Sequence, residues 1–229
     1  MCGRVVIKSS PEEIGRMLGW EDLPNFPPRF NVAPTQPVPI ARLVNGKRRF
    51  ALVRWGLIPA WVKDPREFAL LINARAEGIA EKPSFRAAMQ RRRCLLPVDG
   101  FYEWQKTPKS KRPFYVHPRA GGPMALAGLW ETWSDKDGGE IDTMAIVTCA
   151  ANKYLSPIHD RMPVIVAEKD FDAWLDADKT DVKTALALLK PAPEDFLEAH
   201  EISTRVNSAK NDGPELIEPI EQDAKRTSS

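Results

Sequence analysis

A cysteine stands at position 2, directly behind the initiator methionine, in the opening stretch "MCGRVVIKSS". Removal of Met1 is favoured by a small second residue, and it would leave Cys2 with a free α-amine and a thiol on adjacent carbons. Ordinary pKa values of about 8 for the amine and about 8.5 for the thiol give each a usable nucleophilic fraction near pH 7. Such a pair condenses with an aldehyde to an imine, on which the thiol closes to form a thiazolidine ring. Cys2 therefore predicts a trap for aldehydes.

Two other interpretations of Cys2 remain open at the level of the sequence. An N-terminal-nucleophile hydrolase would use the thiolate to attack an amide and the α-amine as its base. Alternatively, Cys2 is a small buried residue of the first strand. Cys94 and Cys149 lie in apolar runs and are expected in the core, and no cysteine stands at metal-ligand spacing from another cysteine or a histidine. We therefore expect no metal ion and no cofactor.

Three further stretches contain polar groups that could act on a substrate. In "LLINARAEG", Asn73 and Arg75 lie on the same side of an extended segment, and a cation among apolar neighbours suits a phosphate partner. In "PVDGFYEWQ", burial would raise the pKa of Glu103 and suit it to proton transfer. In "SPIHDRMPVI", His159 could be a general acid or base and Arg161 a phosphate clamp. Taken alone, each of three residues also has an ordinary structural interpretation. Asn73 could be a turn-capping amide, Glu103 a salt-bridge partner, and His159 a loop histidine whose hydrogen bonds are satisfied.

Positive charge is concentrated in the first half of the chain, although the net charge is only +2. Residues 1–119 contain 22 Lys and Arg against 10 Asp and Glu, whereas residues 120–229 contain 11 against 21. Trp55, Trp61 and Trp104 are interleaved with the positive charges. A basic surface with aromatic side chains is typical of proteins that bind single-stranded nucleic acid. Charges spread evenly around the molecule are the alternative interpretation.

Short apolar, β-branched and aromatic runs, separated by Pro, Gly and charged clusters, predict many strands, from "GRVVIKSS" to "MPVIVA". Helices are fewer. Ser10 followed by Pro-Glu-Glu predicts a helix start. Further short amphipathic helices are expected over 84–93, 168–178 and 181–190. The proline-rich stretch 22–39 is expected to be an ordered extended loop.

This pattern predicts the α+β class, with a single domain, a strand-rich mixed or antiparallel sheet curled around one core, and short peripheral helices. The last nine residues, 221–229, are expected to form a disordered tail. No apolar run approaches the roughly 18–20 residues that a bilayer span needs, and the N-terminus lacks a signal-peptide pattern. We therefore expect a cytoplasmic protein with no membrane partner.

An ordered set of short motifs resembles the SRAP family, named for SOS response-associated peptidase. The motifs are "MCGR" at the start, "NVAP" at 31–34, "WGLIPAW" at 55–61, "INARAE" at 72–77, "CLLPVDGFYEW" at 94–104, "IVTCAA" at 146–151, "IHDRMPV" at 158–164 and "NDGPELIEPI" at 211–220. Because they run in order through nearly the whole chain, the resemblance implies one SRAP-like domain over residues 1–220 with a β-barrel core.

The resemblance implies a DNA-repair protein, a sensor of abasic sites in single-stranded DNA that crosslinks itself to the lesion. Cys2 would capture the ring-opened deoxyribose aldehyde as a thiazolidine after loss of Met1. Asn73 would hold the attached sugar, and Glu103 would transfer protons near the α-amine. His159 would assist opening of the sugar ring and resolution of the imine.

The resemblance also implies a set of DNA contacts. The phosphate contacts would be Arg4, Arg75 and Arg161. Pro34 and Trp61 would form a wedge that stacks on bases. Two further polar contacts would be Asn31 and Thr148. The wedge would tolerate a duplex on one side of the lesion, so the expected partners are single-stranded DNA and single-strand/double-strand junctions that contain an abasic site. The protein is expected to be a monomer, associated with the nucleoid when it is bound to DNA.

Two alternatives to crosslinking remain, namely a cysteine peptidase of the N-terminal-nucleophile type and a noncatalytic module that binds single-stranded DNA. The peptidase activity that the family name implies would here release only Met1. The sequence departs from the bacterial family pattern in a longer "VKDPREFAL" segment after Trp61 and in the tail after Ile220. The resemblance therefore says least about the DNA groove near Trp61.

Overall fold

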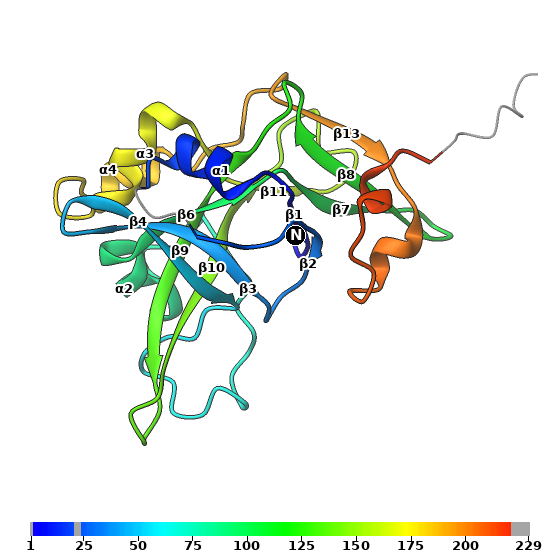
Figure 1. Cartoon of the computed structure of the whole chain (residues 1–229). Helices are drawn as coiled ribbons and strands as arrows, with labels where there is room; N and C mark the ends of the chain where they lie inside the picture. The colour runs from blue at the N-terminus through cyan, green and yellow to red at the C-terminus, as the bar shows by residue number, and fades with distance from the viewer. Residues whose placement is uncertain (1, 21–23, 221–229) are drawn as a thin grey trace, which may run out of the picture.

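Two β-sheets carry the structure, a computed structural model that describes residues 2–20 and 24–220 (Figure 1). The first sheet has five strands in the order β13-β8-β7-β1-β2, and all its pairs are antiparallel. Its members are β1 (Val5–Ile7), β2 (Arg29–Val32), β7 (Gly100–Lys106), β8 (Lys111–Pro118) and β13 (Leu197–Glu201). The expected tail at 221–229 lies outside the described residues, so its disorder stays a prediction.

The second sheet is mixed and closes on itself. Its members are β3 (Pro37–Val44), β4 (Lys47–Trp55), β5 (Asn73–Arg75), β6 (Arg93–Val98), β9 (Met124–Ser134), β10 (Glu140–Ala150), β11 (Arg161–Pro163) and β12 (Ile165–Val166). β9 pairs with β6 on one side and with β10 on the other, while β10 also pairs with β4 in parallel. The run β10-β4-β3-β6-β9 therefore forms a closed barrel.

One main hydrophobic core joins the two sheets. It contains Val5 and Phe101 from the first sheet and Leu95 and Met144 from the second, all fully buried. Cys94 and Cys149 are also buried, as predicted. The α+β class, the mixed sheet and the barrel core are confirmed.

The outer face of the first sheet carries a second, smaller core. Successive strand residues point to opposite faces, so Val6 leaves the main core and packs with Tyr102 and Tyr115. Val206, from the C-terminal part of the chain, completes this cluster. The C-terminal segment thus covers the outer face of the first sheet, where it lies beside β7 and β8 (Figure 1).

The helices are short and lie on the side of the molecule away from β7, β8 and β13 (Figure 1). They are α1 (Pro11–Leu18), α2 (Pro83–Arg91), α3 (Phe171–Leu175) and α4 (Val182–Ala187), with the 3-10 turn η1 (Glu168–Asp170). The 3-10 turns η2 (Thr204–Asn207) and η3 (Pro214–Ile217) belong instead to the C-terminal segment beside β7 and β8. As predicted, Ser10 caps α1, because its hydroxyl accepts the Glu13 backbone N–H at 3.2 Å. No helix within residues 2–20 and 24–220 is long and apolar enough to cross a membrane.

Four predicted boundaries differ from the structure. The helix expected over 168–178 is divided into η1 and α3, and α3 ends at Leu175. The helix expected over 84–93 ends at Arg91, because Arg93 already pairs in β6. The helix expected over 181–190 ends at Ala187. The proline-rich stretch contains β2 and the beginning of β3, and Pro37 is the first residue of β3, a position that tolerates a missing backbone donor.

Candidate functional site

The start of the chain is fixed where the two sheets meet. β1 lies between β7 and β2, and the Arg4 carbonyl accepts the Tyr102 backbone N–H at 3.1 Å. Ahead of β1, Cys2 is fully buried, and its carbonyl accepts a hydrogen bond of 2.9 Å from the Asn73 side-chain amide. Asn73 is the first residue of β5, which pairs in parallel with β10. A terminal segment that would ordinarily fray is thereby held by both sheets.

Glu103 lies on β7 with only 3% of its surface exposed. Burial raises the pKa of this carboxyl from its ordinary value of 4.5 to about 7. Glu103 can therefore gain and lose a proton near neutral pH. Burial, and after it the Glu103 carboxylate, raises the pKa of the Cys2 thiol well above its usual range. A reaction at this sulfur consequently needs a group that accepts its proton.

His159 lies in the loop between β10 and β11 and is half-buried. Burial lowers the pKa of its imidazole, so the ring is neutral at pH 7. Nδ1 accepts the Arg161 backbone N–H at 3.0 Å, which leaves the proton of the neutral ring on Nε2. The Asp160 carboxylate lies 2.9 Å from Nδ1 and forms an ion pair with the ring only in the protonated form.

An open hollow of about 490 Å³ lies beside this pair of titratable groups. It is lined by Glu103, Trp104, Lys106, Lys111, His159 and Asn207. The structure thus brings Cys2, Asn73, Glu103 and His159 together from four separate segments, which the sequence could name but not place. Their roles in a reaction stay predictions.

Three of the predicted DNA contacts form a second cluster near the C-terminal end of β10, where it pairs with β5 and β11. Arg75 lies opposite Thr148 in the parallel pairing of β5 with β10, and its side chain is exposed. Thr148 is fully buried, and its carbonyl accepts a hydrogen bond of 2.7 Å from Nη2 of Arg161. Of the three, Arg75 is therefore the one whose side chain lies open to solvent.

Arg161 is held by a carboxylate that the sequence reasoning did not single out. Its Nη1 and Nη2 donate to Oε1 and Oε2 of Glu77 at 2.7 and 2.8 Å, a bidentate ion pair. This pairing holds the pKa of Glu77 below its usual range. Glu77 ends the "INARAE" motif in the turn that follows β5, and its partner Arg161 lies on β11, so no local sequence signal pairs the two. A phosphate at Arg161 would have to share the guanidinium with Glu77 or displace it.

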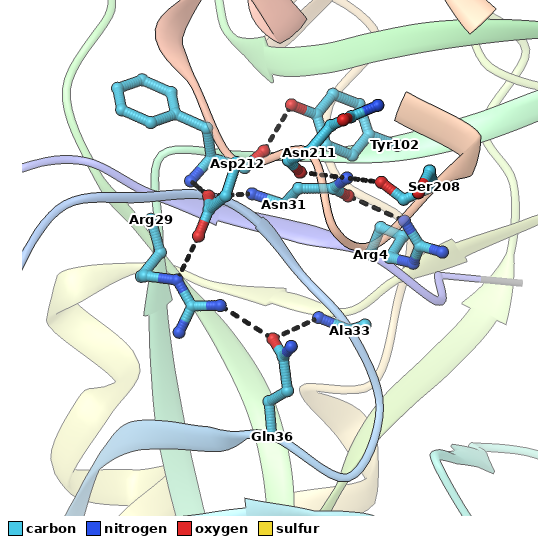
Figure 2. A network of polar contacts seen from close by, with 10 residues as sticks. Arg4, Arg29, Asn31, Ala33, Gln36, Tyr102, Ser208, Asn211 and Asp212 are labelled. Atoms are coloured by element: carbon cyan, nitrogen blue, oxygen red, sulfur yellow. Dashed lines mark hydrogen bonds and ion pairs between the residues drawn. The ribbon is translucent and has the colours of Figure 1, made fainter. Parts of the chain in front are cut away.

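Arg4 and Asn31, predicted as DNA contacts, take part in a network inside the protein (Figure 2). The Arg4 guanidinium donates to Oδ1 of Asn31 at 2.9 Å and to the carbonyls of Val206 and Asn207 at 2.8 and 3.2 Å. Both side chains therefore hold the C-terminal segment that forms one wall of the hollow through Asn207. A direct DNA contact by either residue stays a prediction.

Asn31 is fully buried, and its amide group binds three backbone carbonyls of this segment. Figure 2 shows the bonds to Ser208 and Asn211. Nδ2 lies 3.2 Å from the Val206 carbonyl, 3.1 Å from that of Ser208 and 2.9 Å from that of Asn211. The Asp212 carboxylate accepts the Asn31 backbone N–H at 3.0 Å and also binds the Arg29 guanidinium. The "NVAP" and "NDGPELIEPI" motifs thus meet in one network.

Pro34 and Trp61 follow β2 and β4 respectively. Pro34 is half-buried in a turn in which the Thr35 backbone N–H donates to the Trp55 carbonyl at 2.7 Å. Trp61 is 58% exposed and packs edge-on against Phe68, with ring centroids 5.5 Å apart. An exposed indole of this kind suits stacking on a nucleobase.

The family model of the SOS response associated peptidases (SRAP) matches residues 1–209. The chain belongs to the SRAP family. A Bacillus subtilis SRAP relative, the abasic site processing protein YoqW, is 40% identical over 222 residues, which cover 95% of this chain and 99% of that protein. The abasic site processing protein HMCES of Xenopus tropicalis is 28% identical over 265 residues, or 96% of this chain and 78% of that protein. A crystal structure from Bacteroides thetaiotaomicron matches with a TM-score of 0.86 at 25% identity and covers 96% of this chain and 100% of that one.

Replacing Asn31 by alanine tests the network that this SRAP chain builds around its C-terminal segment. Asn31→Ala removes the side-chain donor of three carbonyls. The Val206 carbonyl keeps its bond from Arg4 and the Ser208 carbonyl keeps its bond from the Asn211 backbone N–H, so that of Asn211 is the one left without a donor among the described residues. The substitution should lower the free energy of unfolding by about 1–3 kcal/mol. Hydrogen exchange should accelerate at residues 206–212. Ser208→Ala is the matched control, because Asn31 binds the backbone carbonyl of Ser208, which the substitution retains. Unchanged protection of 206–212 in Asn31→Ala would show that this segment does not depend on the network.

The pH dependence of stability tests the environment of Glu103. The folded protein binds the proton of the Glu103 carboxyl more tightly than the unfolded chain does. The free energy of unfolding should therefore fall as pH rises from about 4.5 through about 7. Glu103→Gln removes the effect, which amounts to roughly 3 kcal/mol at most over this window. Urea unfolding of parent and variant between pH 4 and 8 measures it. Parallel pH profiles for the two proteins would be incompatible with a raised pKa at Glu103.

Proposed function

We propose that this protein captures abasic sites in single-stranded DNA through a covalent bond to Cys2 after Met1 has been removed. The observation that carries the proposal is the hydrogen bond from Asn73 to the Cys2 carbonyl, which holds the reactive residue beside a carboxyl with a pKa of about 7. The names of the curated relatives, abasic site processing proteins, support the same substrate. The role is therefore a DNA-processing one.

The chemistry follows from the groups around Cys2. The ring-opened abasic sugar presents an aldehyde at its first carbon. The α-amine of Cys2 adds to this carbon and loses one water, giving an imine. The thiol then adds to the imine carbon while its proton passes to the nitrogen, and a five-membered thiazolidine results. The overall change is the loss of one water per crosslink.

Glu103 and His159 would move the protons in these steps. Glu103 exchanges a proton near neutral pH, so it can take one from the α-ammonium group and return one to the departing hydroxyl. The neutral His159 can accept the proton of the sugar hydroxyl when the ring opens, and it can assist resolution of the imine. Asn73 would hold the sugar as well as the Cys2 carbonyl. Self-removal of Met1 by these groups would be the peptidase activity of the family name.

DNA would be held around the lesion by charge and by stacking. Arg75, Arg161 and Arg4 would bind phosphates, and the buried Thr148 and Asn31 would hold the last two in place through the hydrogen bonds described above. Pro34 and Trp61 would stack on bases, at roughly 1–3 kcal/mol per base, and separate a single strand from a duplex. We propose a monomer that acts in the cytoplasm on chromosomal DNA and tolerates single-strand/double-strand junctions.

Crosslinking of an oligonucleotide tests the proposal. A single strand with one abasic site should give a DNA–protein band that survives denaturation, and undamaged DNA of the same sequence should give none. Cys2→Ala should lose the band and keep noncovalent binding. An extra residue before Cys2 should also abolish the band, because the amine becomes an amide.

The alternatives give different results in the same assay. A peptidase would release peptide product beyond one equivalent of enzyme and leave the oligonucleotide unmodified. A noncatalytic binding module would bind the DNA equally well before and after Cys2→Ala, and neither protein would form the band. Either outcome with correctly processed protein refutes the crosslinking proposal.

A further inference from the structure

Two lysines on the wall of the hollow face each other across the β7–β8 hairpin. Lys106 and Lys111 are the last pair in the register of these strands, and both line the hollow beside Glu103 and His159. Directly opposed residues of an antiparallel pair point to the same face, with Cβ atoms about 4.5–5.5 Å apart. Two positive charges are therefore concentrated at one place on the wall.

This arrangement is unfavourable unless an anion joins it, because like charges placed directly opposite one another destabilise a hairpin. Within residues 2–20 and 24–220, neither Lys106 nor Lys111 forms an ion pair with a carboxylate. Arg112, the next residue on β8, does have a carboxylate partner, because its guanidinium binds Glu201. Lys106 and Lys111 therefore bring two uncompensated charges to the hollow.

The wall that carries the lysines is held at both sides. The Gln105 side-chain amide donates to the Pro157 carbonyl at 2.9 Å, which ties β7 to the loop that contains His159. The Trp104 indole N–H donates to Oδ1 of Asn207 at 2.8 Å, which ties the same strand to the C-terminal segment. These bonds fix the strand from which the exposed Lys106 and Lys111 side chains extend, so the two charges start from a preformed wall.

We propose that Lys106 and Lys111 together bind the DNA phosphate that flanks the abasic sugar on the side of the β7–β8 hairpin. This inference rests on the proposed function, because a sugar attached to Cys2 beside Glu103 and His159 brings its own phosphodiester to this wall. Neither Arg75 nor Arg161 lines the hollow, so this phosphate is distinct from the one they would bind. The lysines thereby fix the direction in which the strand leaves the lesion.

The charge of Lys106 also reaches His159. Burial lowers the pKa of the His159 imidazole, the Asp160 carboxylate raises it, and the positive charge of Lys106 adds a smaller lowering. A phosphate bound between the lysines would offset the contribution of Lys106.

The salt dependence of binding tests the inference. The probe is a single-stranded oligonucleotide with a tetrahydrofuran abasic analogue, which has no aldehyde and cannot crosslink. Lys106→Gln/Lys111→Gln should reduce the slope of log Kd against log salt by about 0.7, the value expected when the protein neutralises one phosphate fewer on single-stranded DNA. Affinity at about 50 mM salt should fall by roughly tenfold. Circular dichroism checks that the exposed substitutions leave the fold intact.

Lys109→Gln supplies the matched control for each single variant. Lys109 lies in the same hairpin, and its substitution removes the same charge, but it does not line the hollow. If the single variants Lys106→Gln and Lys111→Gln show the same slope of log Kd against log salt as Lys109→Gln, the inference is overturned. The effect would then be general electrostatic attraction.

Neutral methylphosphonate linkages placed on one side or the other of the lesion locate the phosphate. The parent should lose affinity wherever the neutral linkage replaces a phosphate that it binds, and the double lysine variant should be insensitive to the substitution on one side only, the side of the phosphate that the lysines bind. Equal sensitivity of parent and variant at both positions contradicts the inference. Failure of the proposed function is seen separately, as absence of a crosslink between the parent and an aldehyde-bearing oligonucleotide.

Discussion

The hydrogen bond between the Asn73 amide and the Cys2 carbonyl is the contact on which the candidate site depends. Residue 2 of a chain is ordinarily frayed, and a frayed aminothiol would react without selectivity. Here β1 is inserted between β7 and β2, and Asn73 reaches residue 2 from β5, which the barrel strand β10 positions. The site therefore exists only when both sheets are packed around their common core.

Burial gives this site its chemistry. A carboxyl with 3% of its surface exposed has its pKa raised to about 7, and the neighbouring thiol is held in its protonated form. The cationic side chains near the site are of two kinds, paired with a carboxylate or without one. Arg161 is neutralised by the bidentate Glu77 carboxylate, whereas Lys106 and Lys111 face the hollow with no carboxylate partner among the described residues. The protein thus separates a fixed, paired cation from cations that are available to a ligand.

The features that depend on residues close together in the chain were predicted from the sequence. Ser10 caps α1, Asn73 and Arg75 occupy the same short strand, and an apolar strand buries Glu103. The ordered motifs also predicted the family and the barrel. The remaining features depend on contacts between distant segments. Asn31 binds a carbonyl 175 residues away, so its inward role could not be read from "NVAP" alone.

The network around Arg4 and Asn31 illustrates why motif residues need a structure before they receive roles. A motif shows that a residue type recurs at a position, and it does not distinguish a residue that touches DNA from one that holds the wall beside it. Both side chains donate or accept hydrogen bonds within the protein, and the wall they hold carries Asn207. Glu77 was overlooked for the same reason, since its partner Arg161 lies on another strand.

The intact mass of the protein, measured before and after exposure to an abasic oligonucleotide, is the decisive observation for capture through Cys2. We expect a chain that begins at Cys2 and gains the mass of the oligonucleotide less one water, with the added mass located on the first residue by peptide mapping. A crosslinked protein that retains Met1, or an adduct on any other residue, would be incompatible with capture by the processed terminus.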